Sequence, residues 1–328
     1  MNRRTFIGTL AGGLLTAPLA AAAQQTERIY RIGVLWHADS REGEGPIFEA
    51  LITGLRERGY VEGRNVAFEH RFAAEAPERF RSLAAELVAL KPDVLVGAGA
   101  ASAAALKSTG TSIPIVFTSV GDPVAAGLVR STAKPTENIT GFSILSADLT
   151  AKRLQLMLEI FPRTLQIGVL YNPDNPLNRR VLSEVTSATQ ALKVAAYLVE
   201  VRNGSEIDSA FTRFAANGIK AVLVATDPLL YFERKRIAQA AITAGIAESH
   251  FSRAGAEAGA LFSYGANIPE EVRHSSEYVV KILLGARPAD LPIVEPSRFE
   301  LAINLKTAKA LGLTIPPSLL QRADQVIE

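Results

Sequence analysis

Short apolar segments alternate with longer amphipathic segments along most of the chain. The short segments are rich in Val and Ile and almost uniformly apolar, which is typical of parallel strands covered by helices on both faces. The pattern predicts α/β units that build parallel sheets. The predicted strands are residues 32–36, 65–71, 94–97, 115–118, 139–142, 166–171, 195–201, 221–225, 246–249 and 260–263.

The longer segments carry apolar residues at helical spacing and fill the gaps between the strands. The predicted helices are residues 46–58, 77–90, 150–160, 177–192, 207–216, 230–244 and 269–284. The strands form two series of similar length and order, so we expect two doubly wound, Rossmann-like α/β lobes. A last apolar run at residues 299–304, followed by a helix from Lys306, predicts that the C-terminal segment returns to a lobe already built.

The N-terminus carries an export signal. Arg3 and Arg4 precede a short apolar stretch rich in Ala, Leu and Gly, which ends in a small-residue cleavage pattern near Ala23. This pattern predicts a signal peptide over residues 1–23. The paired arginines resemble the twin-arginine signal, although Asn2 and Gly8 depart from it, so the sequence leaves the Sec and twin-arginine routes open.

The composition of the chain excludes several classes of protein. The formal net charge is +2, and loss of residues 1–23 brings the mature chain near zero, which gives no footprint for nucleic-acid binding. The chain has no Cys, which excludes disulfides, thiol chemistry and an acylated N-terminal cysteine. We therefore expect a mature protein that is free in the periplasm and makes membrane contact only through a partner.

An Asp or Asn followed by Pro marks three predicted strand ends: Asp122-Pro123, Asn175-Pro176 and Asp227-Pro228. Each pair predicts a helix N-cap with a first-turn proline. In an open parallel sheet such loops lie at the carboxyl ends of the strands, where ligands bind. Capping alone explains the residues, but the helix N-termini could also bind a carboxylate, with Asp122 or Asp227 near an ammonium group.

A glycine-rich turn follows the third predicted strand. Gly97 and Gly99 precede Ser102, but the segment lacks the third glycine and the later acidic residue of a dinucleotide-binding turn. We interpret it as a tight turn that brings backbone amides and the Ser102 hydroxyl close to a small ligand. A turn that serves packing alone fits the residues equally well.

Aromatic residues also lie at strand ends. Trp36 is the only Trp of the chain, and Tyr171 and Tyr264 end two later strands. An apolar platform with a polar edge suits a small organic ligand, whereas core packing is the alternative for each ring.

Motifs of the common enzyme classes are absent from the sequence. It contains no H-E-x-x-H, no G-x-S-x-G and no P-loop, and its four histidines lack metal-ligand spacing. The sequence therefore predicts no catalytic residue, metal or cofactor.

These pieces together resemble a known family, the ABC transporter substrate-binding proteins related to the tryptophan and tyrosine binders. The resemblance covers essentially the whole mature chain. The segments that carry it are residues 32–35, 48–66, 92–96, 113–117, 121–124, 138–141, 168–173 and 303–313. The most specific are Leu-Arg-Glu-Arg-Gly-Tyr at 55–60 and the final segment.

The resemblance implies a type I periplasmic binding fold, in which three crossovers form a hinge between two lobes. It places residues 24–143 and 268–295 in the first lobe and residues 144–267 and 296–328 in the second. The crossovers would lie near residues 142–145, 265–268 and 295–298. It also implies a permease and an ATPase as partners, and a monomer.

The predicted function is binding without chemistry. The lobes close on a small solute, for which an amino acid or another carboxylate is favoured, and the permease recognises the closed form. Two alternatives remain, a ligand sensor that docks on a receptor and a periplasmic enzyme. The predicted ligand-binding residues are Trp36, Ser102, Ser119 and Asp122 from the first lobe and Tyr171, Asn172, Asp227 and Tyr264 from the second.

Overall fold

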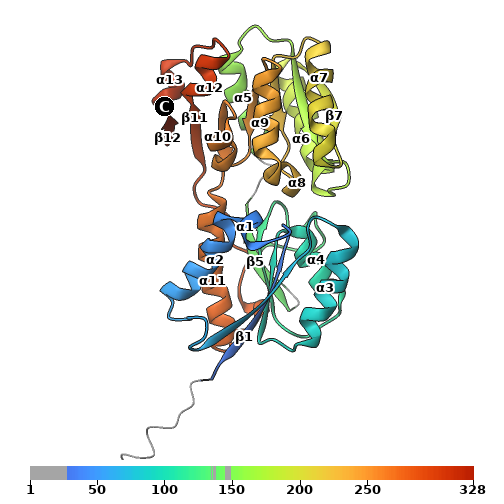
Figure 1. Ribbon diagram of the computed structural model, residues 1–328, viewed down its shortest axis with the longest axis vertical. Helices are drawn as coiled ribbons and strands as arrows, with labels where there is room; N and C mark the ends of the chain where they lie inside the picture. The colour runs from blue at the N-terminus through green and yellow to red at the C-terminus, as the bar shows by residue number, and fades with distance from the viewer. Residues whose placement is uncertain (1–27, 134, 136–137, 145–148) are drawn as a thin grey trace, which may run out of the picture.

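The protein folds into two α/β lobes that face each other across a cleft, as a computed structural model shows (Figure 1). The structure describes residues 28–133, 135, 138–144 and 149–328. The predicted signal peptide, residues 1–23, and residue 145 of the first predicted crossover lie outside these ranges. No helix within the described ranges is long and apolar enough to cross a membrane.

The first lobe contains a parallel five-stranded sheet with the order β2-β1-β3-β4-β5. Its strands are β1 (Tyr30–Trp36), β2 (Val66–Phe72), β3 (Val94–Ala98), β4 (Ile115–Val120) and β5 (Ile139–Ser143). Its helices are α1 (Arg41–Glu44), α2 (Pro46–Glu57), α3 (Pro77–Ala89), α4 (Ala100–Ser108) and α11 (Ile268–Leu283).

The second lobe contains a seven-stranded sheet with the order β12-β11-β10-β9-β8-β6-β7, in which only the β10–β11 pair is antiparallel. Its strands are β6 (Gln166–Tyr171), β7 (Ala195–Glu200), β8 (Ala221–Val224), β9 (Ala247–His250), β10 (Phe262–Gly265), β11 (Glu300–Asn304) and β12 (Gln325–Ile327). Its helices are α5 (Thr150–Ile160), α6 (Leu177–Leu192), α7 (Ile207–Ala216), α8 (Pro228–Phe232), α9 (Arg234–Thr243), α10 (Arg253–Ala258), α12 (Leu305–Ala310) and α13 (Pro317–Leu320).

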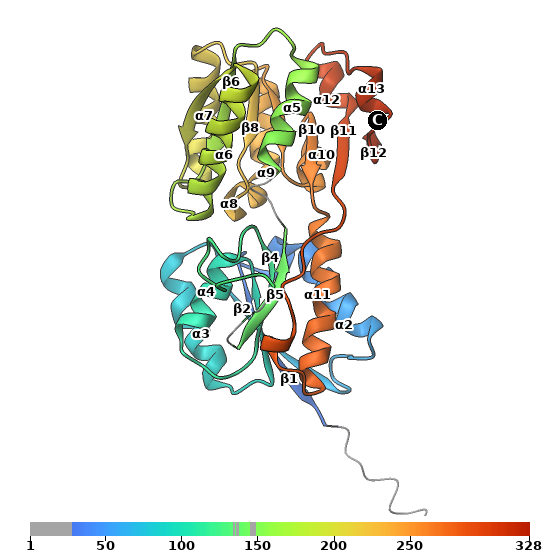
Figure 2. The same cartoon turned by 180° about the vertical axis from the view of Figure 1, so that it is seen from behind.

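Helix α11 returns to the first lobe after the second lobe has been started, and it lies beside α2 there (Figure 2). Asn267 caps the helix by accepting a hydrogen bond from the Glu270 amide at 3.1 Å. The α2–α11 contact is close at Gly54, where an added methyl group would lie 2.4 Å from the Arg273 carbonyl oxygen. The chain therefore passes between the lobes three times: from β5 to α5, from β10 to α11, and after Val294 to β11.

The hydrophobic core explains why the strands are apolar on both sides. One core cluster lies on the α2 and α11 face of the first sheet and continues into the second lobe, whereas two others fill the opposite faces of the two sheets. The predicted α/β fold of two parallel-sheet lobes is confirmed. The differences are local: the predicted helix 230–244 is divided into α8 and α9, and the predicted ranges do not include α1, α4, α10, α13 and β12.

Candidate functional site

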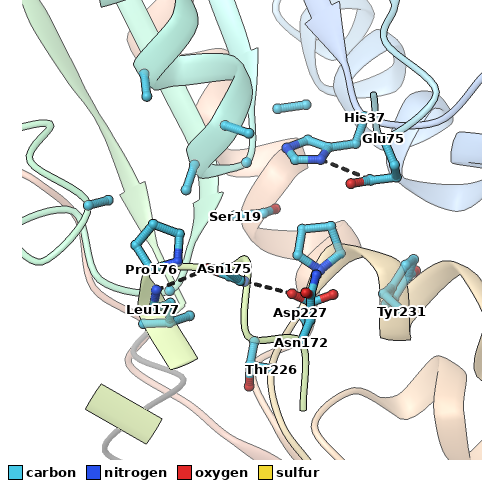
Figure 3. Close-up of a pocket in the computed structure, with 18 of the residues that line it drawn as sticks. His37, Glu75, Ser119, Asn172, Asn175, Pro176, Leu177, Thr226, Asp227 and Tyr231 are labelled. Atoms are coloured by element: carbon cyan, nitrogen blue, oxygen red, sulfur yellow. Dashed lines mark hydrogen bonds and ion pairs between the residues drawn. The ribbon is translucent and has the colours of Figure 1, made fainter. Parts of the chain in front are cut away.

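A cleft of about 650 Å³ separates the two lobes at the carboxyl ends of their strands. In the first lobe, His37 follows β1, Gly99 follows β3, and Ser119 lies near the end of β4. In the second lobe, Asn172 follows β6 and Thr226 follows β8. The arrangement gives a small molecule polar groups from both sheets (Figure 3).

Helix α4 directs its N-terminus into the cleft. Its N-cap is Gly99, whose φ of 82° lies in the region that favours glycine, and no side chain caps the helix. Gly99, Ala100 and Ala101 line the cleft. The first amides of a helix carry partial positive charge, so an anionic group of a ligand is favoured here.

His37 stands beside this helix end and is only 6% exposed. Its Nδ1 lies 2.9 Å from Glu75 Oε1, and its backbone amide donates to Glu44 Oε1 at 2.7 Å. Its Nε2 is buried without a hydrogen-bond partner among residues 28–133, 135, 138–144 and 149–328. Burial lowers the pKa of His37, but the negative charges of Glu75, Glu44 and Asp227 outweigh it, so the pKa is raised above 6.5.

Ser119 adopts a strained backbone conformation. Its φ is 58°, in the left-handed region that a serine rarely occupies, and its Oγ is buried without a partner. Strain of this kind persists where the surrounding structure holds it and is frequent at functional sites. The residue lines the cleft on the first-lobe side (Figure 3).

Asp227 lies on the opposite wall and is 2% exposed. It caps α8 by accepting from the Leu230 amide at 3.2 Å, and its Oδ2 accepts from Asn175 Nδ2 at 2.8 Å. Burial raises the pKa of Asp227 to about 6, and the charge of Glu75 on the facing lobe adds to this effect. Nearby, Thr226 Oγ1 and the Tyr231 hydroxyl are buried without partners.

Asp122 and Arg180 form an ion pair across the cleft, in which Arg180 Nη1 donates to Asp122 Oδ2. Asp122 Oδ1 accepts the amides of Val124 and Ala125 at 3.0 and 2.9 Å. The residues from Asp122 onward form turns, so the predicted helix at Asp122-Pro123 is wrong. Asn175-Pro176 and Asp227-Pro228 do precede helices, α6 and α8.

Apolar side chains complete the walls of the cleft. Phe80 comes from α3, Phe232 from α8, Phe251 follows β9, and a row of alanines comes from α4. Such a lining, with few polar groups at fixed positions, is typical of a small-molecule site. No cluster of three or more potential metal ligands occurs among the residues that the structure describes.

Half of the predicted ligand-binding residues do line the cleft: Ser119, Asp122, Asn172 and Asp227. Trp36 does not. It is fully buried in the first-lobe core, where its Nε1 lies 3.1 Å from His70 Nδ1 and its ring stacks on Phe72. The predicted place of Trp36 in the cleft is therefore corrected to a core position.

The other three predicted residues also lie outside the cleft lining. Ser102 is fully buried on α4. Tyr171 packs on the second-lobe core. Its pKa is raised, mainly by burial and to a smaller extent by the negative charge of Glu200. Tyr264 borders a small cavity of about 10 Å³ next to the cleft, with room for about one water molecule, and packs on Phe299.

Sequence reasoning missed His37, Glu75 and Tyr231, which are among the most distinctive polar groups of the cleft. His37 had a signal, because it is the first residue after a predicted strand. Glu75 and Tyr231 had none, since the first lies in a connection after β2 and the second inside a helix.

The fold and the cleft first identify the structural class of the protein. Two doubly wound lobes with three passages between them are the type I periplasmic binding fold. Within that class, residues 39–327 match the family described as ABC transporter substrate binding protein, and the chain belongs to this family.

Similar proteins support the assignment. The chain is 29% identical to a tyrosine-binding protein of Clostridioides difficile over 81% of this chain and 76% of that one. It is 28% identical to a conserved domain protein from Vibrio cholerae, with a TM-score of 0.86, and 25% identical to an ABC domain in complex with L-Trp from Streptococcus pneumonia, with a TM-score of 0.84. Each structural match covers 91% of this chain and all of the other.

Proposed function

We propose that this protein is the periplasmic solute-binding component of an ABC importer and that it binds an amino acid, with an aromatic or branched apolar side chain favoured, between its lobes. The ligand is then passed on chemically unchanged. A permease and an ATPase are the proposed partners, and the protein acts as a monomer. The names of the relatives support the amino-acid class, since one is a tyrosine-binding protein and another holds L-Trp.

The observation that carries the proposal is a set of buried polar atoms, all on residues that line the cleft, without a partner among the residues that the structure describes. They are His37 Nε2 and Ser119 Oγ in the first lobe and Thr226 Oγ1 and the Tyr231 hydroxyl in the second. Each unsatisfied buried group costs about 1–3 kcal/mol, which a ligand recovers by hydrogen bonding to it. Because the groups come from both lobes, one ligand that satisfies them also holds the lobes together.

The charges of the cleft favour a zwitterion. Acidic side chains from both lobes line it, namely Glu44, Glu75, Asp122, Asp174 and Asp227, whereas positive charge comes from the N-terminus of α4 and from Arg81 and Arg202, which also line it. An ammonium group suits the former and a carboxylate the latter. The phenylalanines Phe80, Phe232 and Phe251 then contact the apolar part of the ligand.

A thermal-shift screen tests this function. The panel contains L-tryptophan, L-tyrosine, L-leucine, aromatic acids, nucleosides and sugars. A ligand at a hundred times its Kd stabilises the native state by about 2.7 kcal/mol, which raises Tm by roughly 5–10 °C for a chain of this size. We expect that rise for one or more of the amino acids, and mass spectrometry should recover the ligand unchanged. A rise with sugars or nucleosides alone contradicts the amino-acid class, and a reaction product contradicts binding without chemistry.

A further inference from the structure

We infer that His37 selects for a carboxylate on the ligand: its Nε2 donates a hydrogen bond to that carboxylate at the N-terminus of α4, and the imidazole is held as the cation by Glu75. The inference rests on the proposed function, since it assigns one end of the amino acid to one group of the cleft. It also makes His37 a residue that sets specificity.

Geometry places Nε2 at the helix end. A methyl group added at Gly99 would lie 2.5 Å from Nε2, so the nitrogen sits directly against the residue that caps α4. Nε2 is buried and has no hydrogen-bond partner within the described part of the chain. The helix has nine residues and no capping side chain, so its first amides are available to an acceptor. The unpartnered Ser119 Oγ lines the same first-lobe wall.

The charges around His37 determine whether Nε2 donates or accepts a hydrogen bond. Glu75, from the segment after β2, accepts at Nδ1, Glu44 lies on α1, and Asp227 faces the ring from the second lobe. Phe80 of α3 meets the ring edge-on at a centroid distance of 4.9 Å. Three carboxylates stabilise the imidazolium, in which both ring nitrogens donate, so Nε2 presents an N–H to the ligand.

The Asp227 end of the cleft disfavours the carboxylate. Asp227 and Glu75 of the facing lobe are both acidic, and the charge of Glu75 adds to the raised pKa of Asp227. A ligand carboxylate beside Asp227 would be repelled, whereas an ammonium group would be attracted. The ligand is therefore oriented with its carboxylate toward α4 and its ammonium toward Asp227.

A dependence of affinity on pH follows. Without ligand, His37 already has a raised pKa, and a bound carboxylate raises it further. For a carboxylate ligand without an ammonium group, affinity is greatest at pH values below the pKa of His37 in the free protein, because such a ligand does not depend on ionised Asp227, whose pKa is about 6. It falls as pH rises through that pKa and levels off above the pKa of the complex. A ligand without a carboxylate shows no such fall.

Calorimetric titration between pH 5.5 and 8.5 with three ligands tests the inference. L-tryptophan carries both charged groups, tryptamine lacks the carboxylate, and indole-3-propionate lacks the ammonium. We expect proton uptake and a fall in affinity with rising pH for indole-3-propionate, and no such fall for tryptamine. For L-tryptophan the fall should appear only above about pH 6, where Asp227 is ionised and attracts the ammonium group. His37→Gln should weaken both carboxylates by about tenfold or more, since a charge-assisted hydrogen bond is lost, while tryptamine changes less than about threefold.

Two further variants test whether the pH dependence and the loss of affinity are specific to His37 and its partner Glu75. Glu75→Gln removes the negative partner of His37, so the fall in affinity should move to lower pH. His274→Gln, a histidine on α11 outside the cleft lining, is the matched control and should change nothing. Equal losses for all three ligands in His37→Gln, or wild-type affinities for both carboxylate ligands that do not fall above about pH 6, would overturn the inference alone. Absence of binding by L-tryptophan, L-tyrosine and L-leucine would overturn the proposed function and the inference with it.

Discussion

At the scale of single residues, neighbouring positions in this chain have opposite fates. Trp36 ends β1 inside the core, whereas His37, one residue later, lines the cleft. Successive side chains on a strand point to opposite faces. An error of one residue in the predicted end of a strand therefore assigns a core side chain to the binding site, or the reverse. The sequence indicated that this strand end contributes to the cleft, but it could not tell which of the two residues does so.

Gly99 provides a prediction at this scale. Gly99→Ala places a methyl group against His37 Nε2 at a φ of 82°, so we expect loss of both backbone stability and ligand affinity. Gly110→Ala is the control, because its φ is 68° and an added methyl group meets nothing within 4 Å. Both variants should lose about 1–2 kcal/mol of unfolding free energy. Only Gly99→Ala should weaken L-tryptophan binding about tenfold or more in calorimetry, and an equal affinity in both variants would contradict the site.

At the scale of elements, most helices and strands follow from periodicity, because apolar spacing sets which face is buried. The three Asp-Pro and Asn-Pro pairs show the limit of this reasoning. An Asx side chain that accepts amides two and three residues later is common to helix caps and to turns, so the same signature precedes α8 and the turns at Asp122. Whether a helix follows depends on the packing of the next residues.

A second prediction concerns the ion pair between Arg180 of α6 and Asp122 of the first lobe. Arg180→Ala removes the ion pair across the cleft, so the unliganded protein should open more often. A partly exposed pair contributes up to about 1 kcal/mol, which corresponds to a loss of L-tryptophan affinity of roughly two- to fivefold, expressed mainly as faster dissociation.

The neighbouring Arg179→Ala is the matched control, because it removes the same charge from an exposed position on α6. Double electron–electron resonance between spin labels on the two lobes, without ligand, measures the opening directly. Longer distances in Arg180→Ala than in Arg179→Ala are expected, and identical distance distributions would show that the pair does not hold the lobes.

At the scale of the whole molecule, the two series of strands indicated two lobes, and that part of the fold was predictable from the sequence. The sequence did not predict which groups face each other across the cleft. The charge of Glu75 helps to raise the pKa of Asp227 although the two residues are far apart in the sequence and lie in different lobes. Their proximity depends on how the passages between the lobes orient two separately folded sheets, and no local pattern encodes that orientation.

The crystal structure of the protein with L-tryptophan is the most direct test of the account. The predicted density lies in the cleft between Gly99 and Ser119 on one side and Asp227 and Tyr231 on the other. Its carboxylate should contact His37 Nε2 and the first amides of α4. Density outside the cleft, or a ligand that contacts one lobe only, would contradict the claim that an amino acid binds by joining the two lobes.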